Sequence, residues 1–259
     1  MSAAGGDGLP TLWHLRFSHF NEKGRWALDY KRVAHRRRSL VPGRHPFRSR
    51  RLGGRGTTPL LQIDGETIGD STEIVARLEQ RDPETPLYPD TDIERNAALE
   101  LEDHFDEELG PQIRSAVFSA LLGDRKMTLD LTMQGLPSRE RVVASALWPV
   151  LRPGLRRSLP ADVAAGQSGR EATVAALDLI ESELHGEYLV GERFSVADLT
   201  AAALLFPLVA PPEFPYELPV RWPEEWEEFR SSLTGRPAFQ WVQEMYSRHR
   251  GSSAAVADD

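Results

Sequence analysis

The stretch of residues 56–73 constrains the fold more than any other part of the chain. It predicts a short strand that begins at Pro59, a tight turn at Asp64-Gly65, and a second short strand. Proline cannot donate a hydrogen bond to a neighbouring strand, which suits the first position of a strand. Asp70 and Ser71 are cap residues and predict a helix start. Because a helix start has free backbone N–H groups and the positive end of the helix dipole, the stretch predicts a hairpin that delivers a small anionic ligand to a helix N-terminus.

Composition excludes several classes of function. The chain of 259 residues contains no cysteine, which rules out disulfides, thiolate zinc sites and cysteine nucleophiles. With 31 Lys and Arg against 39 Asp and Glu, the net charge is −8, so we expect no general binding to nucleic acid. No secretion signal is recognisable at the start, and the most apolar run, residues 199–212, is too short to span a bilayer. We therefore expect a soluble cytoplasmic protein that is not attached to a membrane.

The first part of the chain, residues 10–82, predicts a small mixed sheet with helices on both faces. Strands are expected within residues 10–17 and at Leu40-Val41, in addition to the hairpin. Helices are expected over residues 22–33 and 71–80. Strands and helices in this order indicate an α/β domain.

The second part, residues 90–250, is expected to be helical throughout. Apolar side chains over residues 93–109 predict a long helix whose other side is acidic, and Pro111 is expected to kink or end it. Residues 138–151 predict another helix, and residues 166–169 a polar loop.

A proline-rich connection, residues 82–89, separates the two parts and is the best domain boundary. Further along, Ser195 and Asp198 form a short capping box, and the helix that follows is apolar nearly all round, which predicts a central position. A last helix is expected over residues 237–248. The small, polar tails are expected to be disordered, at residues 1–9 and 251–259.

Together these patterns resemble the soluble glutathione S-transferase family, over about residues 11–248. The resemblance depends on the order of four motifs: Ser-x-x-x-Glu-Lys-x-Arg-Trp-Ala-Leu from Ser18, the Thr58-Pro59 strand entry, the Asp70-Ser71 helix start, and Phe-Ser-Val-Ala-Asp-Leu from Phe194. It implies an α/β plus all-α fold, with a thioredoxin-like N-terminal domain followed by a helical C-terminal domain.

The resemblance also implies an activity. The protein would be a cytoplasmic, homodimeric glutathione transferase of the detoxification type, with glutathione as co-substrate. Ser18 would be the catalytic residue, because a hydroxyl that donates to the glutathione sulfur favours the thiolate, which attacks a small electrophile. Asn21 is a second candidate for contact with the sulfur.

The glutathione-binding positions are implied in the same way. Thr58 and Pro59 match the cis-proline turn that holds the cysteinyl part of glutathione. Asp70 and Ser71 match the positions that hold its γ-glutamyl end.

The chain also departs from this family. Relatives with this helix start often carry Cys-Pro-x-Cys or Ser-Pro-x-Cys where this chain has Ser18-His19-Phe20-Asn21, and the loss of both cysteines removes dithiol chemistry. His19 and Gly24 are further departures, and Ser18 is also consistent with a plain helix cap. A second hypothesis is therefore a non-catalytic glutathione-transferase-like binding or interaction module. A glutaredoxin-like thiol reductase is a third hypothesis.

Two charged stretches are each consistent with more than one role. Residues 31–55 are rich in Lys and Arg and contain no acid. They are consistent with attraction of glutathione carboxylates, a nucleic-acid patch or, as we favour, a solvated face that pairs with the acidic helix. His104 and its acidic neighbours have helical metal-ligand spacing, but we favour a solvated acidic face and expect no metal. We favour a solvated loop position for His19 over contact with substrate.

Overall fold

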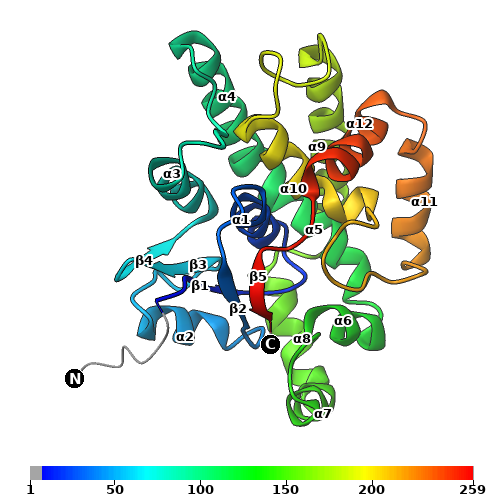
Figure 1. Cartoon of the computed structure of the whole chain (residues 1–259). Helices are drawn as coiled ribbons and strands as arrows, with labels where there is room; N and C mark the ends of the chain where they lie inside the picture. Colours follow the sequence, from blue (N-terminus) through cyan, green and yellow to red (C-terminus); the bar gives the residue numbers. More distant parts are fainter. Residues whose placement is uncertain (1–7, 259) are drawn as a thin grey trace.

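A five-stranded mixed sheet forms the core of the N-terminal part, in the described residues 8–258 of the computed structural model (Figure 1). The strands are β1 (Thr11–His14), β2 (His35–Ser39), β3 (Leu60–Ile63), β4 (Glu66–Gly69) and β5 (Ala255–Asp258). Their order across the sheet is β4-β3-β1-β2-β5. β1 and β2 run parallel, as do β2 and β5, whereas β3 is antiparallel to both β1 and β4. The predicted hairpin is confirmed, with Asp64 and Gly65 at positive φ in its turn.

Helices cover the sheet on both sides. Helices α1 (His19–Tyr30) and α3 (Ser71–Arg81) pack against each other on one side, and α2 (His45–Arg51) lies on the other (Figure 1). Both faces of α1 are buried, because its outer side packs against a helix of the C-terminal part. Trp26 and Leu28 of α1 are fully buried. This arrangement fixes the start of α1 at the junction of the two parts.

The second strand is not at Leu40-Val41, as the sequence suggested, but at His35–Ser39, in an arginine-rich segment. Its inward side chains, His35 and Arg37, are buried. Arg37 donates to Asp29 of α1 at 2.6 Å and to His35 at 3.1 Å. Because polar partners meet these side chains inside the fold, a strand forms where the composition suggested a solvated face.

The C-terminal part is helical, which confirms the predicted fold class. Its helices are α4 (Asp92–His104), α5 (Gly110–Leu121), α6 (Arg125–Thr132), α7 (Ser138–Ala146), α8 (Trp148–Ser158), α9 (Val163–Glu183), α10 (Val196–Val209), α11 (Glu224–Leu233) and α12 (Pro237–Met245). Every residue of α10 is buried, and the predicted capping box of Ser195 and Asp198 is present at its start. Helix α10 packs against α1, α4 and α12, so it is the centre of this part.

Several helix boundaries differ from expectation. Pro111 does not end the first long helix, because α4 continues through a π-helical turn, Phe105–Leu109, into α5, where proline occupies the tolerated first turn. The helix expected over residues 138–151 is two helices, α7 and α8. The loop expected at residues 166–169 is part of α9. There the glycines allow close helix packing: a Cβ on Gly169 would lie only 2.3 Å from the carbonyl oxygen of Gln112 in α5.

The C-terminal segment is ordered, contrary to expectation. β5 pairs with the outer edge of β2, so residues 251–258 return to the N-terminal sheet. Arg250, buried just before this segment, ion-pairs with Glu22 and Asp29 of α1, and the Ala254 N–H donates to Asp29 at 2.8 Å. A polar composition does not prevent this pairing, since the bonds between strands are made by the main chain. Most of the other expected tail, residues 1–7, and residue 259 lie outside the described residues.

Candidate functional site

A cavity of about 630 Å³ lies where the sheet domain meets the helices. Its wall contains the predicted catalytic residue, Ser18, and four of the predicted glutathione-binding residues: Thr58, Pro59, Asp70 and Ser71. These residues come from the start of α1, the entry to β3 and the start of α3. The fold therefore brings to one cavity five residues that are spread over three segments of the sequence.

The Ser18 hydroxyl is positioned by a hydrogen bond from Asn21. Asn21 is fully buried, and its Nδ2 donates to Ser18 Oγ at 2.6 Å and to Thr58 Oγ1 at 3.2 Å. The Leu15 N–H donates to Asn21 Oδ1 at 3.1 Å, which fixes the amide so that its NH₂ group faces the two hydroxyls. Ser18 Oγ thus accepts one hydrogen bond and keeps its own proton to donate. Although Ser18 is the N-cap residue of α1, its side chain makes no cap hydrogen bond, so its role is not that of a plain helix cap.

The hairpin and α3 shape the adjoining wall. The Thr58-Pro59 peptide bond is cis, as the resemblance implied. The Asp70 N–H donates to the Pro59 carbonyl at 3.4 Å, and the Asp70 carboxylate accepts from the Thr72 N–H at 2.8 Å. Gly24 packs against the same proline, because a Cβ there would lie 3.4 Å from Pro59 Cγ. The departure from the family at position 24 thus leaves the proline ring in close contact with α1.

A buried lysine fixes the two helix starts relative to each other. Lys23 of α1 ion-pairs with Glu102 of α4 at 2.7 Å and with Asp106, and donates to Thr72 Oγ1 of α3 at 2.8 Å. Lys23 and Glu102 are both fully buried. Burial raises the pKa of Glu102, and the nearby Lys23 charge opposes this shift. The expected solvated acidic face is therefore wrong at Glu102, which pairs with Lys23 to position the site.

The far side of the cavity is an apolar chamber between α5, α6 and α8. Its apolar lining comprises Val117, Phe118, Leu129, Met133, Trp148, Leu151, Leu155 and Leu159. Sequence reasoning missed this chamber, because short helices that face a hollow from several directions show no long apolar stripe. The signal available was the cluster of large apolar residues in a segment without clear periodicity.

His19 lines the cavity and is buried, so the expected solvated loop position is wrong. Burial and, to a smaller extent, the Arg114 charge lower its pKa to about 3, although a hydrogen bond with the Gly110 backbone acts in the opposite direction. The imidazole is therefore neutral at physiological pH. Arg114 of α5 also lines the cavity, and no pattern in the sequence singled it out.

The basic stretch divides into a buried and an exposed part. Lys31 is buried and ion-pairs with Glu79 at 2.7 Å, and Arg37 is buried beside Asp29, so the expectation of a fully solvated face is wrong for both. Arg32 is exposed just after α1, and the other exposed arginines lie on and around α2: Arg44, Arg48, Arg50, Arg51 and Arg55.

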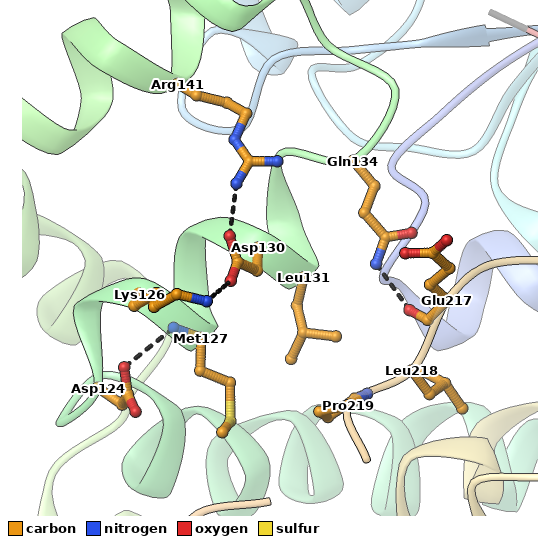
Figure 2. A pocket seen from close by; sticks show the side chains of 10 residues that line it. All are labelled: Asp124, Lys126, Met127, Asp130, Leu131, Gln134, Arg141, Glu217, Leu218 and Pro219. Carbon is orange, nitrogen blue, oxygen red and sulfur yellow. Dashed lines mark hydrogen bonds and ion pairs between the residues drawn. The ribbon is translucent and has the colours of Figure 1, made fainter. Parts of the chain in front are cut away.

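A second cavity of about 570 Å³ lies beside α6 (Figure 2). Arg141 and Lys126 both ion-pair with Asp130, and Gln134 donates to the Glu217 carbonyl at 2.7 Å. Both cations of this wall are paired with Asp130, and none of the predicted site residues lines this cavity, so the first cavity is the better candidate for a ligand site. Within residues 8–258, no group of three or more His, Cys, Asp or Glu side chains is placed to hold a metal ion. None of the described helices has the length and apolar character needed to cross a membrane.

Comparisons with known proteins identify the family of both parts of the chain. The family model "Glutathione S-transferase, N-terminal domain" matches residues 12–86, and "Glutathione S-transferase, C-terminal domain" matches residues 162–231. No curated protein matches the chain.

Among solved structures, FzlA from C. crescentus is 26% identical, with 90% of this chain and 91% of that chain covered and a TM-score of 0.54. The theta class glutathione S-transferase from Xanthomonas axonopodis pv. citri, with glutathione bound, is 18% identical, with coverage of 95% and 99% and a TM-score of 0.57. Glutathione transferase GSTFuA2 from Phanerochaete chrysosporium is 15% identical, with coverage of 95% and 99% and a TM-score of 0.62. The last two show similarity of fold alone. With both family models matched in order along the chain, this protein belongs to the glutathione S-transferase family.

Proposed function

We propose that this protein is a glutathione transferase in which Ser18 activates the glutathione thiol for attack on a small electrophile. The observation that carries the proposal is the state of the Ser18 hydroxyl. The hydroxyl lines the cavity and accepts a hydrogen bond from the buried Asn21, so its own proton is available for a ligand. A serine whose proton were used within the protein could not act in this way.

The chemistry follows from the neighbouring groups. A donor at the sulfur, together with the positive end of the α1 dipole, favours thiolate over thiol and lowers the thiol pKa. The backbone of Thr58 would hold the cysteinyl part, the start of α3 at Ser71 the γ-glutamyl carboxylate, and the Asp70 carboxylate the amine. Asn21 would act through Ser18 and Thr58, with which it is hydrogen-bonded. That the theta class structure of similar fold contains glutathione supports this choice of ligand.

Other parts of the proposal depend on family membership. Residues 10–82 would be the glutathione-binding domain, and residues 90–250 the domain that binds the electrophile. A cytoplasmic homodimer with a detoxification role is the corresponding expectation, and light scattering of the purified protein tests the dimer directly.

The test combines binding and turnover. We expect calorimetry to detect binding of glutathione at millimolar concentration or below. We also expect the protein to catalyse the reaction of glutathione with 1-chloro-2,4-dinitrobenzene. Ser18→Ala should lower kcat/KM at least about tenfold, because a hydrogen bond to a charged group contributes about 1.5–3 kcal/mol. The ultraviolet absorbance of bound thiolate should titrate at a higher pH in this variant. Ser182→Ala, at an exposed serine of α9, is the matched control.

Two outcomes would contradict the proposal in different ways. If the wild-type protein binds no glutathione, the transferase function is lost and a non-catalytic glutathione-transferase-like module takes its place. If glutathione binds but Ser18→Ala leaves the thiol titration unchanged, the catalytic assignment of Ser18 is wrong.

A further inference from the structure

Arg114 is a cation at the cavity wall that has no ion-pair partner among residues 8–258. It lies on α5, is half-buried, and lines the cavity. Its Nε is buried and has no hydrogen-bond partner among the described residues. No acidic side chain of the described chain forms an ion pair with it. An anionic ligand in the cavity would stabilise this partly buried charge.

Other buried arginines of this protein are paired. Arg37 and Arg250 both contact the Asp29 carboxylate, which raises the pKa of each guanidinium although burial alone would lower it. Burial lowers the pKa of Arg114, and no carboxylate opposes the shift. Arg114 thus differs from these two arginines. Arg152 of α8 also has a buried Nε without a hydrogen-bond partner among the described residues, but Arg152 is not at the cavity wall. Perturbed groups of this kind cluster at functional sites.

The surroundings of Arg114 define the rest of the ligand. Arg114 is the one charged side chain that α5, α6, α7 and α8 contribute to the wall, in the described part of the chain. Aromatic and aliphatic groups, including Phe118, Leu129 and Trp148, surround the space beyond it. A ligand that satisfies both features has an apolar body and one anionic group.

Arg114 and Ser18 line the same cavity. The Arg114 charge also acts on His19, the residue that follows Ser18 in the chain. An anion at Arg114 and the position proposed for the thiol therefore share one cavity of about 630 Å³, and one small molecule can carry both the electrophilic atom and the anionic group. A substituted benzoate is a molecule of this kind.

From these observations we infer that the electrophile is a small apolar acid, and that Arg114 binds its carboxylate or an equivalent anionic group. The inference rests on the proposed transferase function and assigns to it a substrate class and a specificity-determining residue.

A matched pair of substrates tests the inference: 4-chloro-3,5-dinitrobenzoate and its methyl ester. In both, the glutathione sulfur forms a bond to the ring carbon, the C–Cl bond breaks, chloride leaves with the electron pair, and the thiol proton goes to solvent. Each rate is divided by the uncatalysed rate with glutathione, because the ester activates the ring more strongly than the carboxylate. We expect the wild-type protein to accelerate the acid more than the ester.

Variants then locate the effect. Arg114→Gln should lower the corrected kcat/KM about tenfold for the acid and leave the ester and the KM for glutathione nearly unchanged. Arg114→Lys should retain part of the preference for the acid. Arg157→Gln, at an exposed arginine of α8, makes the same change in net charge away from the cavity wall and should have no effect.

Three kinetic results would overturn the inference: equal losses for acid and ester, a raised KM for glutathione with an unchanged acid-to-ester ratio, or a wild-type protein that does not prefer the acid. The first would mean that Arg114 serves the thiol or the fold, and the second that it binds glutathione.

Calorimetry with 3,5-dinitrobenzoate, which lacks a leaving group, and with its methyl ester separates this inference from the proposed function. Tighter binding of the acid that Arg114→Gln abolishes, without turnover of any substrate, supports the anion site and refutes the transferase. Equal binding of acid and ester to the wild-type protein refutes the anion site.

Discussion

Arg250 joins the C-terminal segment to the first helix through two buried ion pairs, and its replacement should have a large effect on stability. Its Nε donates to Glu22 at 2.6 Å and its Nη1 donates to Asp29 at 2.8 Å, with only 2% of the residue exposed. Arg250→Met keeps much of the side-chain length and removes the charge. The perturbation therefore tests the ion pairs with little change in packing.

The expected loss follows from the partners that remain. A hydrogen bond to a charged group contributes about 1.5–3 kcal/mol. Glu22 keeps its pair with Arg25 at 2.8 Å, and Asp29 keeps its pair with Arg37 at 2.6 Å, so neither carboxylate is left without a cation. The lower end of the range then applies to each lost bond, which gives about 3 kcal/mol in total. Against a net stability of about 5–15 kcal/mol for a typical protein, this is a large fraction.

Urea unfolding at pH 7 measures the difference, provided that the slopes of the two transitions agree. Arg248→Met is the matched control, since Arg248 is exposed and its loss should leave the midpoint unchanged.

The difference in free energy of unfolding between the wild type and Arg250→Met should also depend on pH. Burial raises the pKa of Asp29, but Arg250 and Arg37 outweigh burial and hold the pKa below its usual value.

Because the pKa of Asp29 is depressed in the folded state, its pairing stabilises the protein above the unfolded pKa of about 4 and is lost as the pH falls further. The difference in free energy of unfolding between the wild type and Arg250→Met should therefore become smaller in acid. A difference under about 1 kcal/mol at neutral pH, or one that stays constant below pH 4, would refute this reasoning.

Two further predictions follow from packing and burial. Gly169→Ala should lower the free energy of unfolding by about 1–3 kcal/mol, because the added Cβ would lie 2.3 Å from the Gln112 carbonyl oxygen. Gly154→Ala, in α8, should raise it by about 0.5–1 kcal/mol, because no atom lies within 4 Å of the added Cβ. Urea unfolding of the two variants checks this prediction, and equal effects on the free energy of unfolding would contradict it. His19 should stay neutral from pH 5 to 8, because burial and the Arg114 charge lower its pKa to about 3. His19→Asn should therefore leave the shape of the kcat/KM profile unchanged over this range, and loss of an inflection near pH 6 or 7 would show that His19 titrates there.

Local signals predicted the parts of the fold that depend on local structure. The turn at Asp64-Gly65, the helix start at Ser71 and the capping box of Ser195 depend on residues a few positions apart, and each is confirmed. The strand β2 could not be found in this way, because the buried Arg37 pairs with Asp29, which belongs to another element. Glycines in α9 suggested a loop because the sequence does not show that another helix approaches them closely.

The same distinction applies to the site. Ser18, Thr58 and Asp70 stand at element boundaries, where cap and turn residues are visible in the sequence, and the structure places them around one cavity. Arg114 lies within a helix and has no distinguishing neighbour in the sequence. Its proposed role follows from its place at the cavity wall and from the absence of a tertiary partner among the described residues, and sequence patterns encode neither feature. Lys23 likewise looks like a surface lysine until its partners on α3 and α4 are known.

The pairing of β5 with β2 has a consequence for synthesis of the chain. β2 leaves the ribosome early, but the strand that covers its outer edge follows only after all the helices of the second part. During that interval β2 is an edge strand whose free N–H and C=O groups can pair with another chain. β2 carries arginine at positions 36, 37 and 38, and charged side chains on an edge strand oppose pairing between copies. The basic composition of this strand therefore disfavours such pairing until Ala255 is synthesised.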